Sequence, residues 1–515
     1  MTDPSQATAV FERLRRHQSP KLALTGKFAG RGAVETAASG SRVTLSDGRS
    51  ALDFGSYAVT LLGHRHPEVV AAVQRQLAVM PTSTRSLANP VSAEAAAVLV
   101  AYFGGALPKV YFGLNGADAV EIAVKLARLA AGRDRVLAVR GGFHGKTLGA
   151  LALTHHPLFR TGLRGCATDV VHLDPDDPDA VRREGARGPF AALVFEPVQG
   201  ENGAVPLAPG VLRRWTQDAQ AQGSFVIADE IQCGLRRCGE RSVALAEGLP
   251  VDAVLVGKPL GGGVVPLSAM VCSEELYAPL AADPFLHSAT FGGHPLSCAA
   301  LPAALAAVEE LAGHGRMLAD RLAAGLRVLQ ARHGRVMSGF RGRGLLWGID
   351  FTAPQAAGEV VVGLANADLL VSPCLSRPTT VRLLPPLTTT AAELDRALDI
   401  LDSALDDAGR ILAADRPDQE NDVTDPQAPR TPDAPGRSLA DIVRTTIADV
   451  LGTTPDEISD STDLEADHGV DSLELMAVGA QLERALGVQI SPEDLMRADN
   501  VGHAIALLTE RTADR

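Results

Sequence analysis

The chain has 515 residues, and this length allows about three to five domains at roughly 100–200 residues per domain. Hydrophobic residues make up 46% of the chain and charged residues 21%, a balance that supports a buried core and excludes disorder along the whole length. The 61 acidic residues outnumber the 48 basic ones, and the net charge of −13 argues against a nucleic-acid partner.

Signals for membrane insertion and export are not found in the sequence. No apolar run reaches the roughly 18 residues that a membrane span needs, and the N-terminal residues contain no apolar signal core. The cysteines have no paired short spacings, which predicts reduced thiols at Cys166, Cys233, Cys238, Cys272, Cys298 and Cys374. We therefore expect a cytoplasmic protein with no membrane partner and no metal site.

Residues 1–415 alternate between apolar strand-like runs and helical patterns, which indicates an α/β fold with helices on both faces of a sheet. A hairpin is expected at 42–54, where Asp47 and Gly48 supply the turn. A Gly-containing turn at 114–118 then opens an amphipathic run at 119–132. An ordinary helix N-cap at Asn115 is the alternative interpretation of this turn.

Three apolar runs further along the chain end in ionisable residues. The run 191–195 is followed by Glu196, 224–228 by Asp229, and 253–257 by Lys258. Continuous apolar runs of this kind are typical of buried parallel strands. Because ligands bind outside the carboxyl ends of such strands, the three residues predict a site.

Lys258 is one of only six lysines in a chain with 42 arginines, and a glycine-rich segment follows it. A lysine in a dry pocket loses basicity and can form a Schiff base with a carbonyl group. The alternative is a lysine that extends its charged end from a strand into solvent. Pyridoxal phosphate is the cofactor that uses such a lysine. It also needs a carboxylate at its pyridine nitrogen, for which Asp229 is a candidate, and a helix start for its phosphate, for which 114–118 is a candidate.

Four longer segments resemble the class III pyridoxal-phosphate aminotransferases, which include the ornithine, acetylornithine, putrescine and 4-aminobutyrate enzymes. The segments are FEPVQGENGAVP (195–206), FVIADEIQCGLRRCG (225–239), LVGKPLGGGVVPLSA (255–269) and ATFGGHPLSCAA (289–300). The resemblance covers nearly all of residues 20–410. It implies a fold type I transferase, with a large, mostly parallel sheet domain and a smaller α/β domain.

The resemblance also implies roles for individual residues. Lys258 matches the Schiff-base lysine, Asp229 the partner of the pyridine nitrogen, and Gln232 a residue near the phenolic oxygen. The remaining cofactor residues would be the aromatic Phe143 that stacks on the ring, its neighbour His144, and the phosphate-binding Gly116 and Ala117.

Thr290 matches a threonine that reaches the phosphate in the other subunit, which implies a homodimer with shared active sites. Arg382 matches the arginine that binds the α-carboxylate of glutamate, and Glu201 matches its acidic partner. A plain structural ion pair is the alternative. Lys146 stands at a substrate-binding position where several members have arginine, and the sequence also departs from the family at Asn115.

Charge separates the end of the chain from the rest. Residues 1–415 contain 40 basic and 40 acidic residues, whereas residues 438–515 contain 5 basic and 16 acidic residues. The 22 residues between them include five prolines and almost no large apolar residue, which predicts an extended, semi-rigid linker at 416–437. We therefore expect three parts, with boundaries at 1–415, 416–437 and 438–515.

The acidic tail is predicted to be an all-α helix bundle. Its first helix places Leu439, Ile442, Val443, Ile447 and Val450 on one face. The segment 469–487 resembles the phosphopantetheine attachment segment of acyl and peptidyl carrier proteins. Ser472 matches the serine that carries 4′-phosphopantetheine, and a simple helix cap at Ser472 is the alternative.

The leading hypothesis is a pyridoxal-phosphate aminotransferase fused to a carrier, acting in polyketide or non-ribosomal peptide biosynthesis, including that of antibiotics. Glutamate would donate the amine and leave as 2-oxoglutarate, and an aldehyde or ketone would accept it. A phosphopantetheinyl transferase and synthase enzymes would be partners of the carrier. Two alternatives remain: an aminomutase or decarboxylase on the same fold, and an aminotransferase for free amines whose carrier only delivers product.

Overall fold

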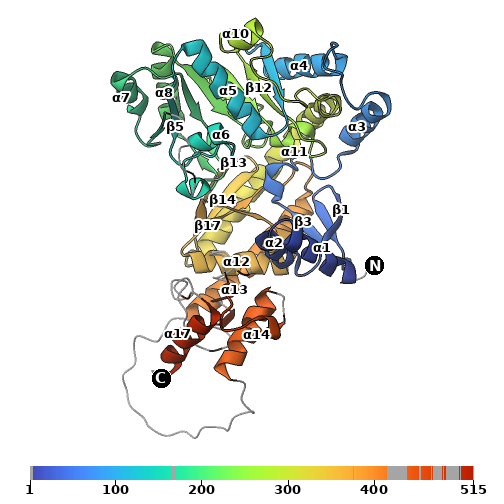
Figure 1. Ribbon diagram of the computed structural model, residues 1–515, viewed down its shortest axis with the longest axis vertical. Helices are drawn as coiled ribbons and strands as arrows, with labels where there is room; N and C mark the ends of the chain where they lie inside the picture. Colours follow the sequence, from blue (N-terminus) through green and yellow to red (C-terminus); the bar gives the residue numbers. More distant parts are fainter. Residues whose placement is uncertain are drawn as a thin grey trace.

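The computed structural model describes residues 4–161, 163, 169–374, 376–414, 438–451, 454–464, 467, 478–479, 481–482, 486, 498 and 500–513. A large sheet domain, a smaller sheet domain and a helical tail follow one another along the longest axis of the molecule (Figure 1).

The large domain is built on a seven-stranded sheet with the order β4-β12-β11-β10-β7-β5-β6. Its inner pairs are parallel, and only β12 is antiparallel to both neighbours, which confirms the mostly parallel sheet. The strands are β4 Lys109–Gly113, β5 Val136–Val139, β6 Val170–Leu173, β7 Ala192–Phe195, β10 Phe225–Asp229, β11 Ala253–Val256 and β12 Ser268–Cys272.

Helices cover both faces of this sheet, because successive residues of a strand point to opposite sides. Val194 and Ile227 belong to an apolar cluster with residues of α5, whereas Leu193 and Val226 belong to another with residues of α8. The helices are α3 Pro67–Val79, α4 Pro90–Tyr102, α5 Gly116–Ala131, α6 Leu148–Leu153, α7 Ala180–Arg187, α8 Pro209–Ala221, α9 Val243–Ala246 and α10 Glu274–Ala282, with short 3₁₀ turns η1 Ser56–Ala58, η2 Pro157–Arg160 and η3 Lys258–Gly261.

The smaller domain contains an antiparallel sheet of order β13-β14-β17-β16 and a second sheet of order β1-β2-β3-β15. The predicted hairpin is confirmed, since β2 pairs with β3 and Gly48 has a φ of 88° in the turn. The elements are β1 Glu35–Ser39, β2 Arg42–Leu45, β3 Ser50–Asp53, β13 Met337–Arg343, β14 Leu346–Phe351, β15 Leu369–Leu370, β16 Ser372–Cys374, β17 Arg377–Leu383, α12 Pro354–Asn366 and α13 Ala391–Ala414, with β8 Val198–Gln199 and β9 Val205–Pro206 as a separate two-stranded sheet.

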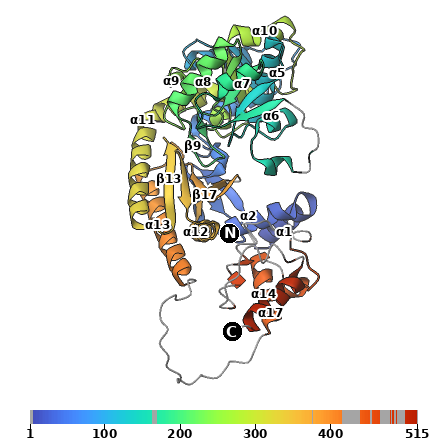
Figure 2. The ribbon, with the colours of Figure 1, turned by 90° about the vertical axis from the view of Figure 1, so that its left-hand side faces the viewer.

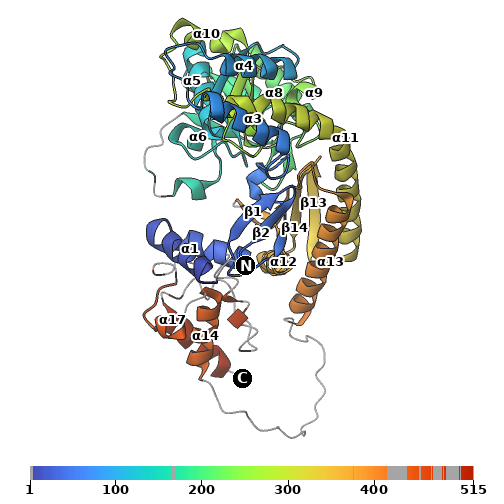
Figure 3. The ribbon, with the colours of Figure 1, turned by 90° about the vertical axis from the view of Figure 1, so that its right-hand side faces the viewer.

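One long helix, α11 Pro295–Arg332, joins the two domains and runs beside α13 (Figures 2 and 3). Its length and composition would allow it to cross a membrane. The sequence did not predict this, because charged and polar residues interrupt its apolar runs. Its inner face is part of the main apolar cluster, together with residues of α4 and α13. On its surface, Glu309 forms ion pairs with Arg236 and Arg241. The buried inner face explains why α11 is so apolar, and we interpret it as a core helix.

The tail contains α14 Leu439–Leu451, the turn η4 Pro455–Glu457 and α17 Val501–Ala513. Val443 and Ile447 of the predicted helix face are buried in one apolar cluster with Val478 and Leu482. The side chain of Val450 lies outside the described residues, and so does Ser472. The five cysteines among the described residues are free and buried, in agreement with the predicted thiols, and Cys166 lies outside that part of the chain.

Candidate active site

Three neighbouring strands of the large sheet end side by side. β7, β10 and β11 are parallel, with Ala228 opposite Phe195 and Asp229 opposite Leu255. Glu196, Asp229 and Lys258 therefore lie at one edge of the sheet, as the sequence predicted.

Lys258 is in an environment that favours its neutral amine. It opens η3 directly after Gly257 and has a φ of 43°, a left-handed conformation that costs a non-glycine residue about 1–3 kcal/mol. Burial lowers the pKa of the Lys258 amine, while the charges of Glu201 and Asp229 oppose that shift. The neutral amine is the form that attacks a carbonyl group.

Asp229 is buried and held by a histidine. Its Oδ2 lies 2.7 Å from Nδ1 of His144, and its Oδ1 accepts a hydrogen bond of 3.2 Å from the Ile231 N–H. Burial lowers the pKa of His144, but the hydrogen bond and charge of Asp229 raise it, and the net shift is upward. The His144 ring is therefore a fixed partner for one carboxylate oxygen of Asp229. The sequence placed His144 in the cofactor site but gave no sign of this bond.

Glu196 completes this buried group of charges. Its carboxylate accepts hydrogen bonds from the N–H of Phe143 at 2.9 Å and of Gly200 at 3.3 Å. Burial raises the pKa of Glu196 to about 7, an effect that His144 opposes and Asp229 reinforces. The two neighbouring strand-end carboxylates therefore differ in their partners, since Asp229 contacts the His144 ring and Glu196 accepts hydrogen bonds from two backbone N–H groups.

The turn before α5 shows why Asn115 is compatible with a phosphate-binding role. Oδ1 of Asn115 accepts a hydrogen bond of 3.2 Å from the Asp118 N–H, and the Asp118 carboxylate accepts from Leu114 at 2.8 Å. Asn115 is thus the N-cap of α5, which was the alternative to a phosphate-binding turn in the sequence interpretation. Gly116 and Ala117 follow at the first helical positions, where N–H groups have no partner within the helix. A cap at Asn115 and an anion site at Gly116 and Ala117 are therefore compatible.

Phe143 and Lys146 both contact the ring of Phe159. The rings of Phe143 and Phe159 pack edge to face with centroids 5.4 Å apart, and Nζ of Lys146 lies 4.9 Å from the centroid of the Phe159 ring. Lys146 is exposed and is held by this cation–π contact. The substrate-binding role of Lys146 stays a prediction.

Arg382 and Glu201 form an ion pair deep in the protein. Arg382 is 1% exposed, and its Nη1 donates to Oε1 of Glu201 at 2.6 Å and to Oε1 of Gln232 at 3.2 Å. Nε of Arg382 is buried and has no hydrogen-bond partner among the described residues. The charges of both Arg382 and Glu201 act on the Lys258 amine, so the pair lies close to the strand-end group, which is the set of Glu196, Asp229 and Lys258. One donor of this planar guanidinium is therefore unsatisfied among the described residues.

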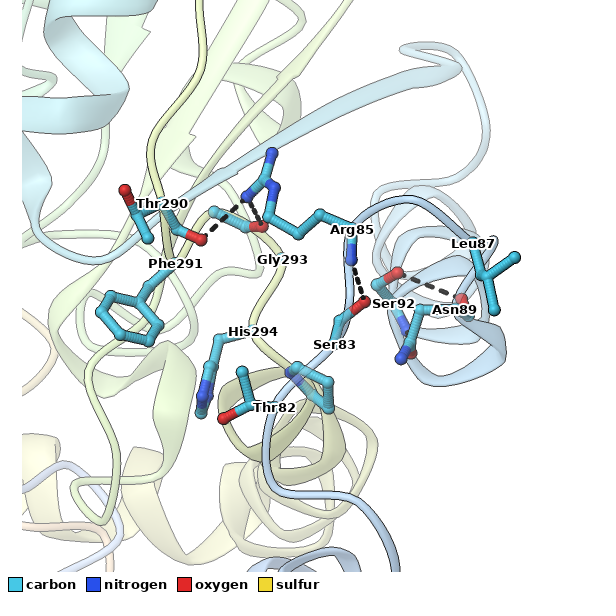
Figure 4. Close-up of a pocket in the computed structure, with 12 residues that line it drawn as sticks. Thr82, Ser83, Arg85, Leu87, Asn89, Ser92, Thr290, Phe291, Gly293 and His294 are labelled. Carbon is cyan, nitrogen blue, oxygen red and sulfur yellow. Dashed lines mark hydrogen bonds between the residues drawn. The ribbon is translucent and has the colours of Figure 1, made fainter.

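Thr290 lies on an exposed loop that lines a pocket of about 170 Å³, and none of Glu196, Asp229 and Lys258 lines that pocket (Figure 4). The loop is held by Arg85, whose Nη1 donates to the carbonyl oxygens of Ala289 at 2.6 Å, Thr290 at 3.1 Å and Gly292 at 3.0 Å. Arg85 is not among the site residues predicted from the sequence. Its partners are about 200 residues away along the chain, and no local pattern marks it.

The residues of the strand-end group fit pyridoxal phosphate. They offer a lysine with lowered pKa and a buried carboxylate, and the start of α5 adds free backbone N–H groups. The backbone at Gly145 and Gly200 leaves no room for larger residues. A Cβ at Gly145 would lie 2.8 Å from Cβ of Ala117, and a Cβ at Gly200 would lie 1.3 Å from Oε1 of Gln232. The pocket at Thr290 is a separate feature of the same chain.

Comparison with known proteins agrees with this geometry. The family model for class III aminotransferases matches residues 30–405, and that for the phosphopantetheine attachment site matches residues 441–508. The putrescine aminotransferase of Pectobacterium atrosepticum is 35% identical over 382 residues, which are 71% of this chain and 81% of that protein.

Solved structures show the same fold. An ornithine aminotransferase from Toxoplasma gondii superposes with a TM-score of 0.69 at 29% identity, over 74% of this chain and 91% of that one. A PLP-bound amine transaminase from an uncultivated Pseudomonas species gives a TM-score of 0.67 at 26% identity, over 73% and 95%. An (S)-enantioselective ω-transaminase from Thermomicrobium roseum gives 0.70 at 25% identity, over 78% and 98%.

Proposed function

The chain belongs to the class III aminotransferases and carries a phosphopantetheine attachment domain, and on this premise we propose that it moves an amino group from glutamate to an aldehyde or ketone. The cofactors are pyridoxal phosphate and 4′-phosphopantetheine. The observation that carries the choice of glutamate is the buried Arg382, whose charge acts on Lys258 and whose guanidinium suits a carboxylate.

The strand-end residues divide the work of this reaction. Lys258 would hold the cofactor and, as a free amine, would take the proton from Cα of the donor. Asp229, positioned by His144, would contact the pyridine nitrogen, while Gly116 and Ala117 would bind the phosphate with backbone N–H groups. The cofactor supplies an electron sink for the charge left at Cα.

A donor assay tests this proposal. Glutamate should bleach the yellow colour of the purified protein, with one 2-oxoglutarate released per active site. Added aldehyde should restore the colour. Release of carbon dioxide, or an isomerised amine without 2-oxoglutarate, would instead indicate a decarboxylase or an aminomutase.

We also propose that the active form is a homodimer in which Thr290 serves the site of the partner subunit. Three large apolar residues in or close in sequence to the segments that line the Thr290 pocket are exposed in the single chain. The exposed fraction is 81% for Val79, 74% for Leu87 and 89% for Phe285. If these side chains form one contiguous patch, a dimer interface would bury them.

Subunit mixing gives a sharp test of the shared site. Lys258→Ala and Thr290→Ala homodimers should each be inactive or weak. A mixed dimer should regain one intact site, because the subunit that keeps Lys258 receives Thr290 from its neighbour. If mixing restores no activity although mixed dimers form, Thr290 acts within its own subunit or not at all.

The carrier domain gives the reaction a tethered acceptor. We propose that the carbonyl compound is an acyl chain on Ser472, within polyketide or non-ribosomal peptide biosynthesis. A flexible linker at 416–437 would span about 26 Å root-mean-square and up to roughly 70 Å when stretched, and it would keep the acyl group at about millimolar effective concentration.

Cutting the linker tests this tethered route. With the released tail at micromolar concentration, amination of the carrier-borne chain should slow by about 10²-fold, while amination of a small free aldehyde stays unchanged. Equal rates before and after the cut would indicate that the carrier serves other enzymes. Intact-mass analysis of the tail would identify the acyl chain.

A further inference from the structure

The first two helices of the chain lie outside the catalytic family match. α1 spans Pro4–His17 and α2 spans Pro20–Gly30, whereas the class III match begins at residue 30. The two helices pack on each other, since a Cβ at Gly26 of α2 would lie 3.8 Å from the ring of Phe11 in α1. We call this pair the N-terminal hairpin.

The N-terminal hairpin shares an apolar cluster with the carrier domain. Leu24 of α2 is only 9% exposed, and it belongs to the same cluster as Val443, Ile447 and Leu508 of the tail. The ribbon views show α1 and α2 next to α14 and α17 from two opposite sides (Figures 2 and 3) and from a direction perpendicular to both (Figure 1). Leu22, two positions earlier on the same helix, is 50% exposed and is not part of the cluster. One face of α2 therefore contacts the tail.

Charge agrees with this contact. The hairpin residues 4–30 contain five basic residues and one acidic residue, and the last turn of α1 carries Arg15 and Arg16. The tail carries 16 acidic and 5 basic residues. Residues 1–415 as a whole are neutral, so the positive charge of the hairpin is a local feature. Opposite charges on two surfaces hold them in one orientation and accelerate their encounter.

We propose that the N-terminal hairpin is the docking site for the carrier domain of this same chain, seated by Leu24 and oriented by the basic end of α1. The hairpin then gives the carrier a resting position on the enzyme between its visits to active sites. This inference goes beyond the transamination chemistry and does not depend on which carbonyl compound is aminated.

Nuclear magnetic resonance of the full-length protein tests the docking directly. A carrier free on its linker would tumble as a small domain and give sharp amide signals, whereas a docked carrier shares the slow tumbling of the enzyme and gives broad ones. We expect broad signals in the wild type and sharp, dispersed tail signals in Leu24→Glu. The matched control Leu22→Glu places the same charge on the exposed face of α2 and should leave the signals broad.

Charge reversal at the end of α1 tests the electrostatic contribution to docking separately from the apolar contact of Leu24. The double variant Arg15→Glu, Arg16→Glu should release the carrier at a salt concentration several-fold lower than the wild type requires. The yellow colour and the glutamate half-reaction of each variant show that the catalytic domain is folded, and they do not depend on docking. Sharp tail signals in the wild type at low salt, or equal effects of Leu24→Glu and Leu22→Glu, would overturn the proposal. Loss of the glutamate reaction in the wild type would instead count against the proposed function.

Discussion

Replacing Glu201 by glutamine tests whether Arg382 is a carboxylate receptor that Glu201 occupies in the free enzyme. The change keeps the shape of the side chain and removes the charge that Arg382 binds at 2.6 Å. Arg382 stays buried and keeps its contact with Gln232. The variant therefore weakens the bond that holds the guanidinium without opening a cavity.

The size of the effect follows from the bond that the donor must displace. A hydrogen bond to a charged group contributes about 1.5–3 kcal/mol, against about 0.5–1.5 kcal/mol for a neutral one. Glutamate should therefore bind the Glu201→Gln enzyme more tightly by about 1–2 kcal/mol, or roughly 5–30-fold. The free variant should also be less stable, because breaking a buried pair costs about 3–5 kcal/mol. Saturating glutamate should restore part of that stability by binding the folded state.

Stopped-flow measurement of colour loss against glutamate concentration gives the affinity, and a diamine without a carboxylate serves as the reference donor. Glu201→Gln should lower the concentration for half-maximal rate with glutamate only, and Arg382→Ala should raise it. Glu247→Gln is the matched control, since it weakens an ion pair with Arg343 that is not among the charges acting on Lys258. If Glu201→Gln shifts both donors equally, the pair is structural and the reasoning is wrong.

Three further predictions concern the cofactor and stability. Lys258→Ala should be inactive and Asp229→Ala should slow proton removal, which the isotope effect of α-deuterated glutamate would reveal; full activity of the lysine variant would rule out the assigned role. Arg85→Ala should raise the cofactor dissociation constant about as much as Thr290→Ala does, measured by equilibrium dialysis, because it releases three carbonyl contacts of the Thr290 loop; an unchanged constant would show that the loop holds its shape alone. Burial raises the pKa of Glu230 to about 7 from an ordinary 4.5, so the folded state binds its proton more tightly than the unfolded state does. Its contribution to stability is greatest below pH 4.5 and decreases by about 3 kcal/mol as the pH rises through 7, and urea unfolding of Glu230→Gln should show a flatter profile between pH 5 and 7.

Much of the fold and of the candidate site could be predicted, because both are encoded in short segments. The buried strands are continuous apolar runs, and the residues after them, such as Asp229 and Lys258, inherit their position from the strands. Contacts between distant segments left no such mark. Arg85 and its loop, and the bond between His144 and Asp229, depend on how separate elements pack in three dimensions. Ser472 lies outside the described residues, and its role stays a prediction.

The continuity of α11 has a mechanical consequence. At about 1.5 Å per residue, its 38 residues form a rod of roughly 57 Å. The helix begins just after the Thr290 loop, contacts η3, packs along α13 of the smaller domain and contains one internal proline, Pro302. Because one continuous helix contacts both η3 and α13, a displacement of the smaller domain would be transmitted to the turn that carries Lys258. We expect closure around a donor to shift the reactive amine as well.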